Sequence, residues 1–151
     1  MAKLIAGNVA PNFSSVDSDG NPISLSQFAG KVVVLYFYPK ANTPGCTREG
    51  ISFRDSMKWF QDHGVVVLGV STDSPAAQKK FKDKYSFNFT MVSDKGKEIS
   101  ESYGVLRFTG TAARTTFIVG KDGKVAAVFE GVKPDGHAQE VIKKLEELKL
   151  V

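Results

Sequence analysis

The chain has 151 residues, 42% of them hydrophobic and eleven of them phenylalanine, which is enough for one domain over residues 1–151 with a substantial core. Its formal net charge of +4 comes from lysines spread along the chain, without the basic stripe and interleaved aromatics that predict nucleic-acid binding. No apolar run is long enough to span a membrane and the N-terminus lacks a signal-peptide pattern, so we expect a cytoplasmic protein with no membrane partner.

The first predicted elements are two short strands at residues 13–16 and 23–25, separated by a segment rich in turn residues. They are expected to pair as a β-hairpin ahead of the main sheet. The continuous apolar run of residues 32–38 predicts a buried strand. A helix follows it, because the apolar side chains Phe53, Met57 and Phe60 recur at helical spacing until Gly64 ends the pattern.

The second half of the chain shows a further β-α unit, then a hairpin and a last helix. In chain order, we predict a buried strand at 65–70, a helix with Ser74 as N-cap and Pro75 as its first residue, a short strand near 90–92, a short helix near 98–103, antiparallel strands at 115–119 and 125–129, and a final helix with Asp135 as N-cap.

This order of elements predicts the fold class. Strands joined through helices pair in parallel, whereas a late hairpin adds antiparallel strands to the same sheet. We therefore expect an α/β, thioredoxin-like three-layer fold, in which a mixed central sheet is flanked by helices and the N-terminal β-hairpin is an extension. Sites in such sheets form beyond the carboxyl ends of the strands, and Cys46 lies there.

The only cysteine, Cys46, stands at the predicted start of the helix after the first buried strand. Thr43 is the expected N-cap, with its hydroxyl reaching the backbone N–H of the second or third helical residue. Pro44 suits the first helical position, and Gly45 removes side-chain bulk beside the sulfur. Unpaired N–H groups and the helix dipole, with Arg48 nearby, favour a thiolate at this position over an inert buried thiol.

A reactive thiolate could serve acyl transfer, disulfide exchange or peroxide reduction. Cysteine hydrolases pair the thiol with a histidine, but His63 and His137 are expected to be surface residues or helix-end charges rather than bases. Disulfide exchange of the C-x-x-C type is excluded, because Thr43 stands where the first cysteine would be. Both observations weaken the alternatives to peroxide reduction.

The residues around Cys46 also resemble a known family. The spacing Pro39-x-x-x-Thr43-x-x-Cys46 resembles the active-site motif of the peroxiredoxins, and the flanking segments resemble their bacterioferritin comigratory protein branch. These segments are Tyr36-Phe-Tyr-Pro39, Thr43-Pro-Gly-Cys-Thr47 and Ser52-Phe-Arg-Asp55, with further matches at 10–13, 25–28, 70–73 and 114–118. The resemblance thus covers nearly the whole chain.

The resemblance implies a thiol-dependent peroxidase that acts on hydrogen peroxide and organic hydroperoxides without a cofactor or metal, in antioxidant defence and cell redox homeostasis. Cys46 would attack a peroxide oxygen and become a sulfenic acid. Thr43 would hydrogen-bond the sulfur and the peroxide, and Arg114 would stabilise the thiolate and the developing negative charge. Pro39 would shape and shield the pocket, and Glu49 would orient the arginine.

The chain departs from many members of that branch at Ile51, where those proteins carry a resolving cysteine. We therefore expect a one-cysteine enzyme, a monomer or weak homodimer, whose sulfenic acid is resolved by an external thiol. That thiol would be thioredoxin-like, glutaredoxin-like, a small molecule or Cys46 of another chain. Two alternatives remain: a peroxide sensor or redox relay, and a non-enzymatic thioredoxin-fold binding or holdase protein in which Cys46 is incidental.

Overall fold

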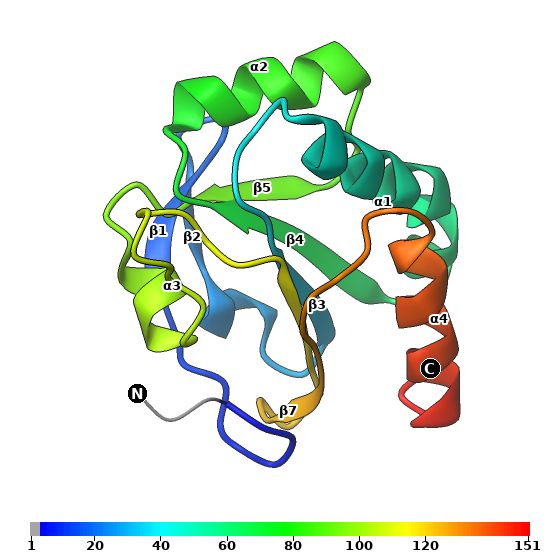
Figure 1. The fold of residues 1–151 in the computed structure, drawn as a ribbon. Coiled ribbons are helices and arrows are strands. Elements are labelled where there is room, and N and C mark those ends of the chain that lie inside the picture. Colours follow the sequence, from blue (N-terminus) through cyan, green and yellow to red (C-terminus); the bar gives the residue numbers. More distant parts are fainter. Residues whose placement is uncertain (1–3) are drawn as a thin grey trace.

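A computed structural model describes residues 4–151, so residues 1–3 of the expected domain lie outside the described part. The elements run in this order (Figure 1): β1 (Ser14–Asp17), β2 (Pro22–Ser24), the 3-10 helix η1 (Leu25–Phe28), β3 (Val32–Phe37), α1 (Pro44–Asp62), β4 (Val65–Ser71), α2 (Pro75–Tyr85), β5 (Thr90–Ser93), α3 (Glu98–Ser102), β6 (Thr115–Val119), β7 (Val125–Phe129) and α4 (His137–Glu147).

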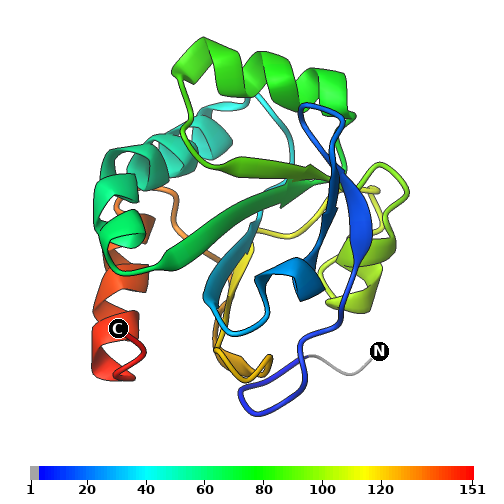
Figure 2. The same ribbon diagram turned by 180° about the vertical axis from the view of Figure 1, so that it is seen from behind.

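The strands within residues 4–151 form one mixed sheet of seven strands in the order β2-β1-β5-β4-β3-β6-β7. Strand β4 pairs in parallel with both β3 and β5, whereas β6 runs antiparallel to β3 and β7. The predicted mixed sheet is therefore confirmed. The N-terminal hairpin extends this same sheet, because β1 pairs with β5 through Val16 opposite Ser93, at the edge seen in Figure 2.

Two apolar layers lie on opposite faces of the sheet. Alternate side chains of β3 explain this, since Val34 and Tyr36 join one core and Val33 and Leu35 the other. Helices α1, α2 and α4 cover the first face, and α3 with η1 covers the second, so that α3 stands across the sheet from α1 and α4 (Figure 1). Burial on both faces is the reason why the strand sequence is continuously apolar.

The N-cap residues predicted for α2 and α4 can be compared with the structure. The Ser74 hydroxyl accepts a hydrogen bond of 3.2 Å from the N–H of Ala77, and Pro75 is the first residue of α2, as predicted. The prediction for the last helix is wrong by one residue, because Gly136 is the N-cap, with φ of +70°. A left-handed backbone at this turn favours glycine, which leaves the Asp135 side chain free to pair elsewhere.

Among residues 4–151, none of the helices combines the length and the apolar character that crossing a membrane requires.

Candidate active site

Strand β3 and helix α1 place Cys46 where the sequence predicts it. The strand ends at Phe37, a short loop follows, and Pro44 opens the helix, so that Cys46 is its third residue. Thr43 has the extended backbone of an N-cap, with φ of −100° and ψ of 155°. The side chain of Cys46 is buried at 1% exposure, and the thiol is free. The sulfur therefore lies in a protein environment close to the unpaired N–H groups of a helix start.

The Thr43 hydroxyl differs from its predicted role as a cap. It donates a hydrogen bond of 2.8 Å to the carbonyl oxygen of Lys40 and makes no capping bond to α1. The loop turns sharply here, since Asn42 adopts a positive φ of 61°, and this turn brings the Lys40 carbonyl back towards Thr43. The hydroxyl therefore closes the loop that leads into the active-site helix, instead of capping that helix.

Arg114 is the cation that the structure brings to the sulfur. Its Nη2 lies 3.5 Å from Sγ of Cys46, and its Nη1 donates a 2.8 Å hydrogen bond to Oε1 of Glu49. Arg114 directly precedes β6, whose Thr115 stands opposite Phe37 at the end of β3. The antiparallel register of these strands thus carries Arg114 to the start of α1.

Gly45 has a specific steric role in this arrangement. A Cβ atom at position 45 would lie 3.0 Å from Nη2 of Arg114 and 3.5 Å from the ring of Pro134. The first of these distances is tighter than an ordinary carbon–nitrogen contact, so a side chain here would push against the guanidinium. The glycine therefore makes room for Arg114 beside Cys46, which refines the sequence expectation that it leaves room beside the sulfur.

The Glu49 carboxyl is buried among these groups. Burial raises its pKa to about 7, although the charge and hydrogen bond of Arg114 act to lower it. Its second oxygen, Oε2, is buried and has no hydrogen-bond partner. Partial burial disfavours the charged form of Arg114, but Cys46 and Glu49 outweigh this and raise the pKa of Arg114 above its ordinary value. Tyr36 on β3 stays a neutral neighbour, because burial raises its pKa well above the ordinary range.

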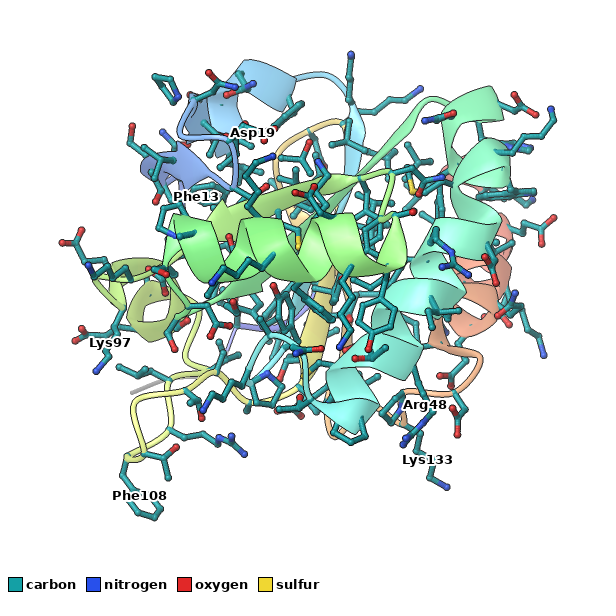
Figure 3. All side chains as sticks on the ribbon, turned by 90° about the horizontal axis from the view of Figure 1, so that it is seen from above. Phe13, Asp19, Arg48, Lys97, Phe108 and Lys133 are labelled. Carbon is teal, nitrogen blue, oxygen red and sulfur yellow. The ribbon has the colours of Figure 1, made fainter. Side chains whose placement is uncertain are left out.

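Arg48 does not supply the positive charge that the sequence suggests. Its Nε donates a hydrogen bond of 2.9 Å to Asp135, and both side chains are more than half exposed. Figure 3 labels Arg48 on α1 and Lys133 in the loop between β7 and α4, the loop that also holds Asp135. Arg48 therefore joins the start of α1 to the start of α4 at the surface, and Arg114 alone is placed against the sulfur.

The loop between β3 and α1 is held by an acid that sequence reasoning missed as a site residue. Oδ2 of Asp73 accepts hydrogen bonds of 2.8 Å from the N–H of Ala41 and of 2.7 Å from the Ser71 hydroxyl. Pro39 lies half-buried in the same loop. The signal was present, because Asp73 follows the carboxyl end of β4, the parallel neighbour of β3, and such ends meet at one edge of the sheet.

His137 is buried, which contradicts the expectation of a surface residue. Its side chain is 0% exposed, with Nε2 lying 2.8 Å from the Thr116 hydroxyl and Nδ1 lying 3.1 Å from Oε1 of Glu140. The rings of Phe53 and Phe129 pack edge-on against it. Its spacing explains the burial, since positions 137, 141 and 145 share the buried face of α4.

His63 is exposed, as expected of a residue at a helix end. It stacks on Trp59 with ring centroids 4.0 Å apart, and its Nδ1 lies 2.7 Å from the Trp59 carbonyl oxygen. The described residues contain no group of three or more His, Cys, Asp or Glu side chains arranged to hold a metal ion.

Comparisons with known proteins assign the chain a family and a fold. The model of the AhpC/TSA family matches residues 6–128. Peroxiredoxin Q of the chloroplast of Sedum lineare is 40% identical over 151 residues, which cover 98% of this chain and 81% of that protein. These two coverages show that the similarity extends along nearly the whole chain and is not limited to a shared motif.

Solved structures agree with this assignment. Peroxidoxin BcpB of Mycobacterium tuberculosis superposes with a TM-score of 0.90 at 34% identity, covering 95% of this chain and 97% of that one. The bacterioferritin comigratory protein of Xanthomonas campestris, solved with a trapped intermediate and ligand in work on its alkyl peroxide reduction activity, has a TM-score of 0.88 at 32% identity over 94% and 98%. These neighbours confirm the predicted thioredoxin-like α/β fold.

Proposed function

The chain belongs to the AhpC/TSA family and is a peroxiredoxin of the Bcp/PrxQ type, and from this we propose that it reduces hydroperoxides through a one-cysteine cycle at Cys46. The observation that carries the proposal is the 3.5 Å contact between Nη2 of Arg114 and Sγ of Cys46 at the start of α1. A partly buried guanidinium beside a sulfur favours the thiolate, which is the nucleophilic form.

In the first half of the cycle, the Cys46 thiolate attacks the terminal oxygen of the hydroperoxide. A sulfur–oxygen bond forms, the oxygen–oxygen bond breaks, and the remaining oxygen leaves as hydroxide or alkoxide that takes up a proton. Sulfur is oxidised to a sulfenic acid and the peroxide is reduced to water or an alcohol. Arg114 stabilises the negative charge that moves from sulfur to the leaving oxygen.

Three further residues support this step in the proposal. The Thr43 hydroxyl lies at the N-terminus of α1 and donates its proton to the Lys40 carbonyl oxygen, so that its oxygen can accept a hydrogen bond from the peroxide. Pro39, half-buried in the same loop, limits access to the sulfur. Glu49 fixes the guanidinium of Arg114 through the 2.8 Å hydrogen bond, so that Nη2 faces Sγ.

The second half of the cycle needs a thiol from outside the chain. The sequence has one cysteine, and Ile51 stands where many members of the branch that this chain resembles carry the resolving one. A first external thiol attacks the sulfenic sulfur and forms a mixed disulfide with release of water; a second thiol then reduces that disulfide and restores Cys46. Because Cys46 is 1% exposed, a bulky thiol reaches the sulfur only after the groups that cover it move.

The proposal is tested by peroxide turnover with a panel of reductants: thioredoxin with its reductase, glutaredoxin with glutathione, and a small dithiol. We expect turnover with at least one of them, and mass spectrometry without excess reductant should detect a mixed disulfide at Cys46. Cys46→Ser should lose all turnover, and Arg114→Lys should retain more activity than Arg114→Ala. Turnover by Cys46→Ser, or a Cys46 sulfenic acid that no thiol reduces, would contradict the one-cysteine cycle.

The same experiment separates the enzyme from a peroxide sensor, which would be oxidised once and would pass its oxidation to a partner without sustained turnover. Membership in a peroxidase family argues against the non-enzymatic alternative. The cytoplasmic location, the role in redox homeostasis and the monomer or weak homodimer stay predictions.

A further inference from the structure

A single cation, Arg114, contacts two ionisable groups in the site, Cys46 and Glu49. Arg114 contacts the sulfur of Cys46 through Nη2 and Oε1 of Glu49 through Nη1, and Cys46 and Glu49 lie one helical turn apart on α1. The neutral Tyr36 on β3 is a further ionisable side chain near Glu49, and the buried His137 on α4 lies within electrostatic range of Arg114. The cluster thus holds one fixed positive charge.

A buried cluster of this kind is most stable when its net charge is zero. With Arg114 positive, this requires one negative charge, carried either by the Cys46 sulfur or by the Glu49 carboxyl. If both were ionised, the cluster would hold an uncompensated buried negative charge. Oε2 of Glu49 agrees with this reasoning, because it is buried without any hydrogen-bond donor to stabilise a carboxylate.

We propose that Glu49 holds a proton on Oε2 while Cys46 is a thiolate and releases it when Cys46 is oxidised, so that the leaving oxygen is neutralised by a proton from the site itself. The proposal rests on the peroxidase cycle described above and adds a proton source to it. Glu49 would then both orient the guanidinium of Arg114 and donate a proton to the leaving oxygen.

Charges and atoms balance through this step. Before the reaction the cluster contains a thiolate, a guanidinium and a neutral carboxylic acid. The terminal peroxide oxygen is transferred to sulfur as the sulfenic acid, which is neutral, and Arg114 is then free to stabilise the Glu49 carboxylate. The proton from Oε2 ends on the leaving oxygen as water or an alcohol. The cluster has zero net charge before and after, and bulk solvent supplies no proton.

The first test measures protons during a single turnover. Reduced protein in weak buffer at a mildly acidic pH, below the Glu49 pKa of about 7, is mixed with stoichiometric hydrogen peroxide, and a pH indicator reports proton uptake for each sulfur oxidised. The ultraviolet absorbance of the thiolate is recorded beforehand at the same pH. We expect a thiolate and almost no proton uptake in the unaltered protein, but uptake of close to one proton in Glu49→Gln, which has no proton to release. Glu146→Gln, at an exposed position of α4, is the matched control and should behave as the unaltered protein.

The second test compares two electrophiles. Alkylation of Cys46 by iodoacetamide expels iodide, which needs no proton, whereas peroxide expels a strongly basic oxygen. Glu49→Gln should therefore slow the peroxide reaction at least tenfold and leave alkylation no slower than in the unaltered protein. A merely structural role for Glu49 would slow both reactions alike and would overturn the proposal.

The unaltered protein alone also decides the question if Glu49→Gln fails to fold. Uptake of one proton per oxidised sulfur, or a reduced protein without thiolate, would refute the proposal while leaving peroxidase turnover intact. An infrared difference spectrum should show a protonated-carboxyl band in the reduced protein that disappears on oxidation. A protein that peroxide does not oxidise would instead refute the proposed function, so the two failures are distinguishable.

Discussion

Nε2 of His137 lies 2.8 Å from the Thr116 hydroxyl in a fully buried contact that joins helix α4 to strand β6. Thr116 is two residues from Arg114, which directly precedes β6. Burial lowers the pKa of His137, the nearby charge of Arg114 acts in the same direction, and the Glu140 carboxylate opposes them in part. The imidazole is therefore neutral at neutral pH and takes part in the fold in that form.

Acid is predicted to destabilise the protein through His137. The unfolded chain binds a proton at this histidine below pH 6.5, whereas the folded protein binds it only at a lower pH. Unfolding is thus accompanied by proton uptake, and the free energy of unfolding falls as the pH drops from 6.5 towards the folded-state pKa, by at most about 1.4 kcal/mol for each pH unit. Urea unfolding of His137→Gln should lack this slope, and His63→Gln should keep it. An unchanged slope in His137→Gln would contradict the assignment.

Glu49 is predicted to act in the opposite direction. Its carboxyl loses a proton near pH 4.5 in the unfolded chain but near pH 7 in the folded protein, so the folded state binds more protons between these values. The free energy of unfolding should therefore fall as the pH rises through this window, by about 3 kcal/mol in total, and should not change further above it. Urea unfolding of Glu49→Gln should lack this decrease. A decrease of the same size in that variant would place its origin elsewhere.

Local patterns were sufficient to predict most of the fold. Residues 32–37 are apolar without interruption because both faces of β3 are covered, and Ser74 with Pro75 has the chemistry that a helix start requires. The capping errors have a physical cause. The Thr43 hydroxyl binds the Lys40 carbonyl because the loop folds back on itself, and Gly136 caps α4 because the chain needs a positive φ there. Both features depend on the path of the chain in three dimensions, which a short sequence pattern does not reveal.

The prediction of the site residues depended more on the resemblance to a known family than on the residue types and their spacing. Cys46 was identifiable from its position after a strand, but Arg114 follows it by 68 positions and meets it only through the register of β3 with β6. The spacing of His137 with the apolar positions of α4 was a usable signal of burial, which its place at a helix end obscured. Asp73 acts through a loop rather than through the sulfur, so its place after β4 was visible in the sequence but did not mark it as a site residue.

Gly45→Ala is predicted to separate activity from stability. The new Cβ would lie 3.0 Å from Nη2 of Arg114 and displace it from Sγ of Cys46, so the second-order rate constant with hydrogen peroxide should fall about tenfold. Stability should be unchanged or slightly higher, because alanine favours the helix over glycine by up to about 1 kcal/mol. Gly96→Ala is the control, since its Cβ would meet only one Glu98 oxygen at 3.8 Å. A full rate constant in Gly45→Ala would show that this contact does not matter.

Asp73→Ala is predicted to slow the reaction of Cys46 with peroxide although Asp73 does not touch the sulfur. The change removes the acceptor for the Ala41 N–H and for the Ser71 hydroxyl, and it loosens the loop that positions Thr43. We expect a loss of about 1–3 kcal/mol of stability, the usual cost of leaving such donors unpaired, and a rate constant reduced severalfold. Stopped-flow tryptophan fluorescence during oxidation gives the rate, and urea unfolding gives the stability.

Two comparisons identify the cause of that loss. Asp73→Asn keeps one carbonyl oxygen as an acceptor and should recover most of the rate, because the loop needs the acceptor rather than the negative charge. Asp122→Ala is the matched control, since Asp122 also accepts a backbone N–H, that of Lys124 at 3.0 Å, but in the turn between β6 and β7. It should lose stability without loss of rate. If Asp73→Asn were as slow as Asp73→Ala, the charge of Asp73 would be the property that Cys46 requires, and the loop-positioning account would be wrong.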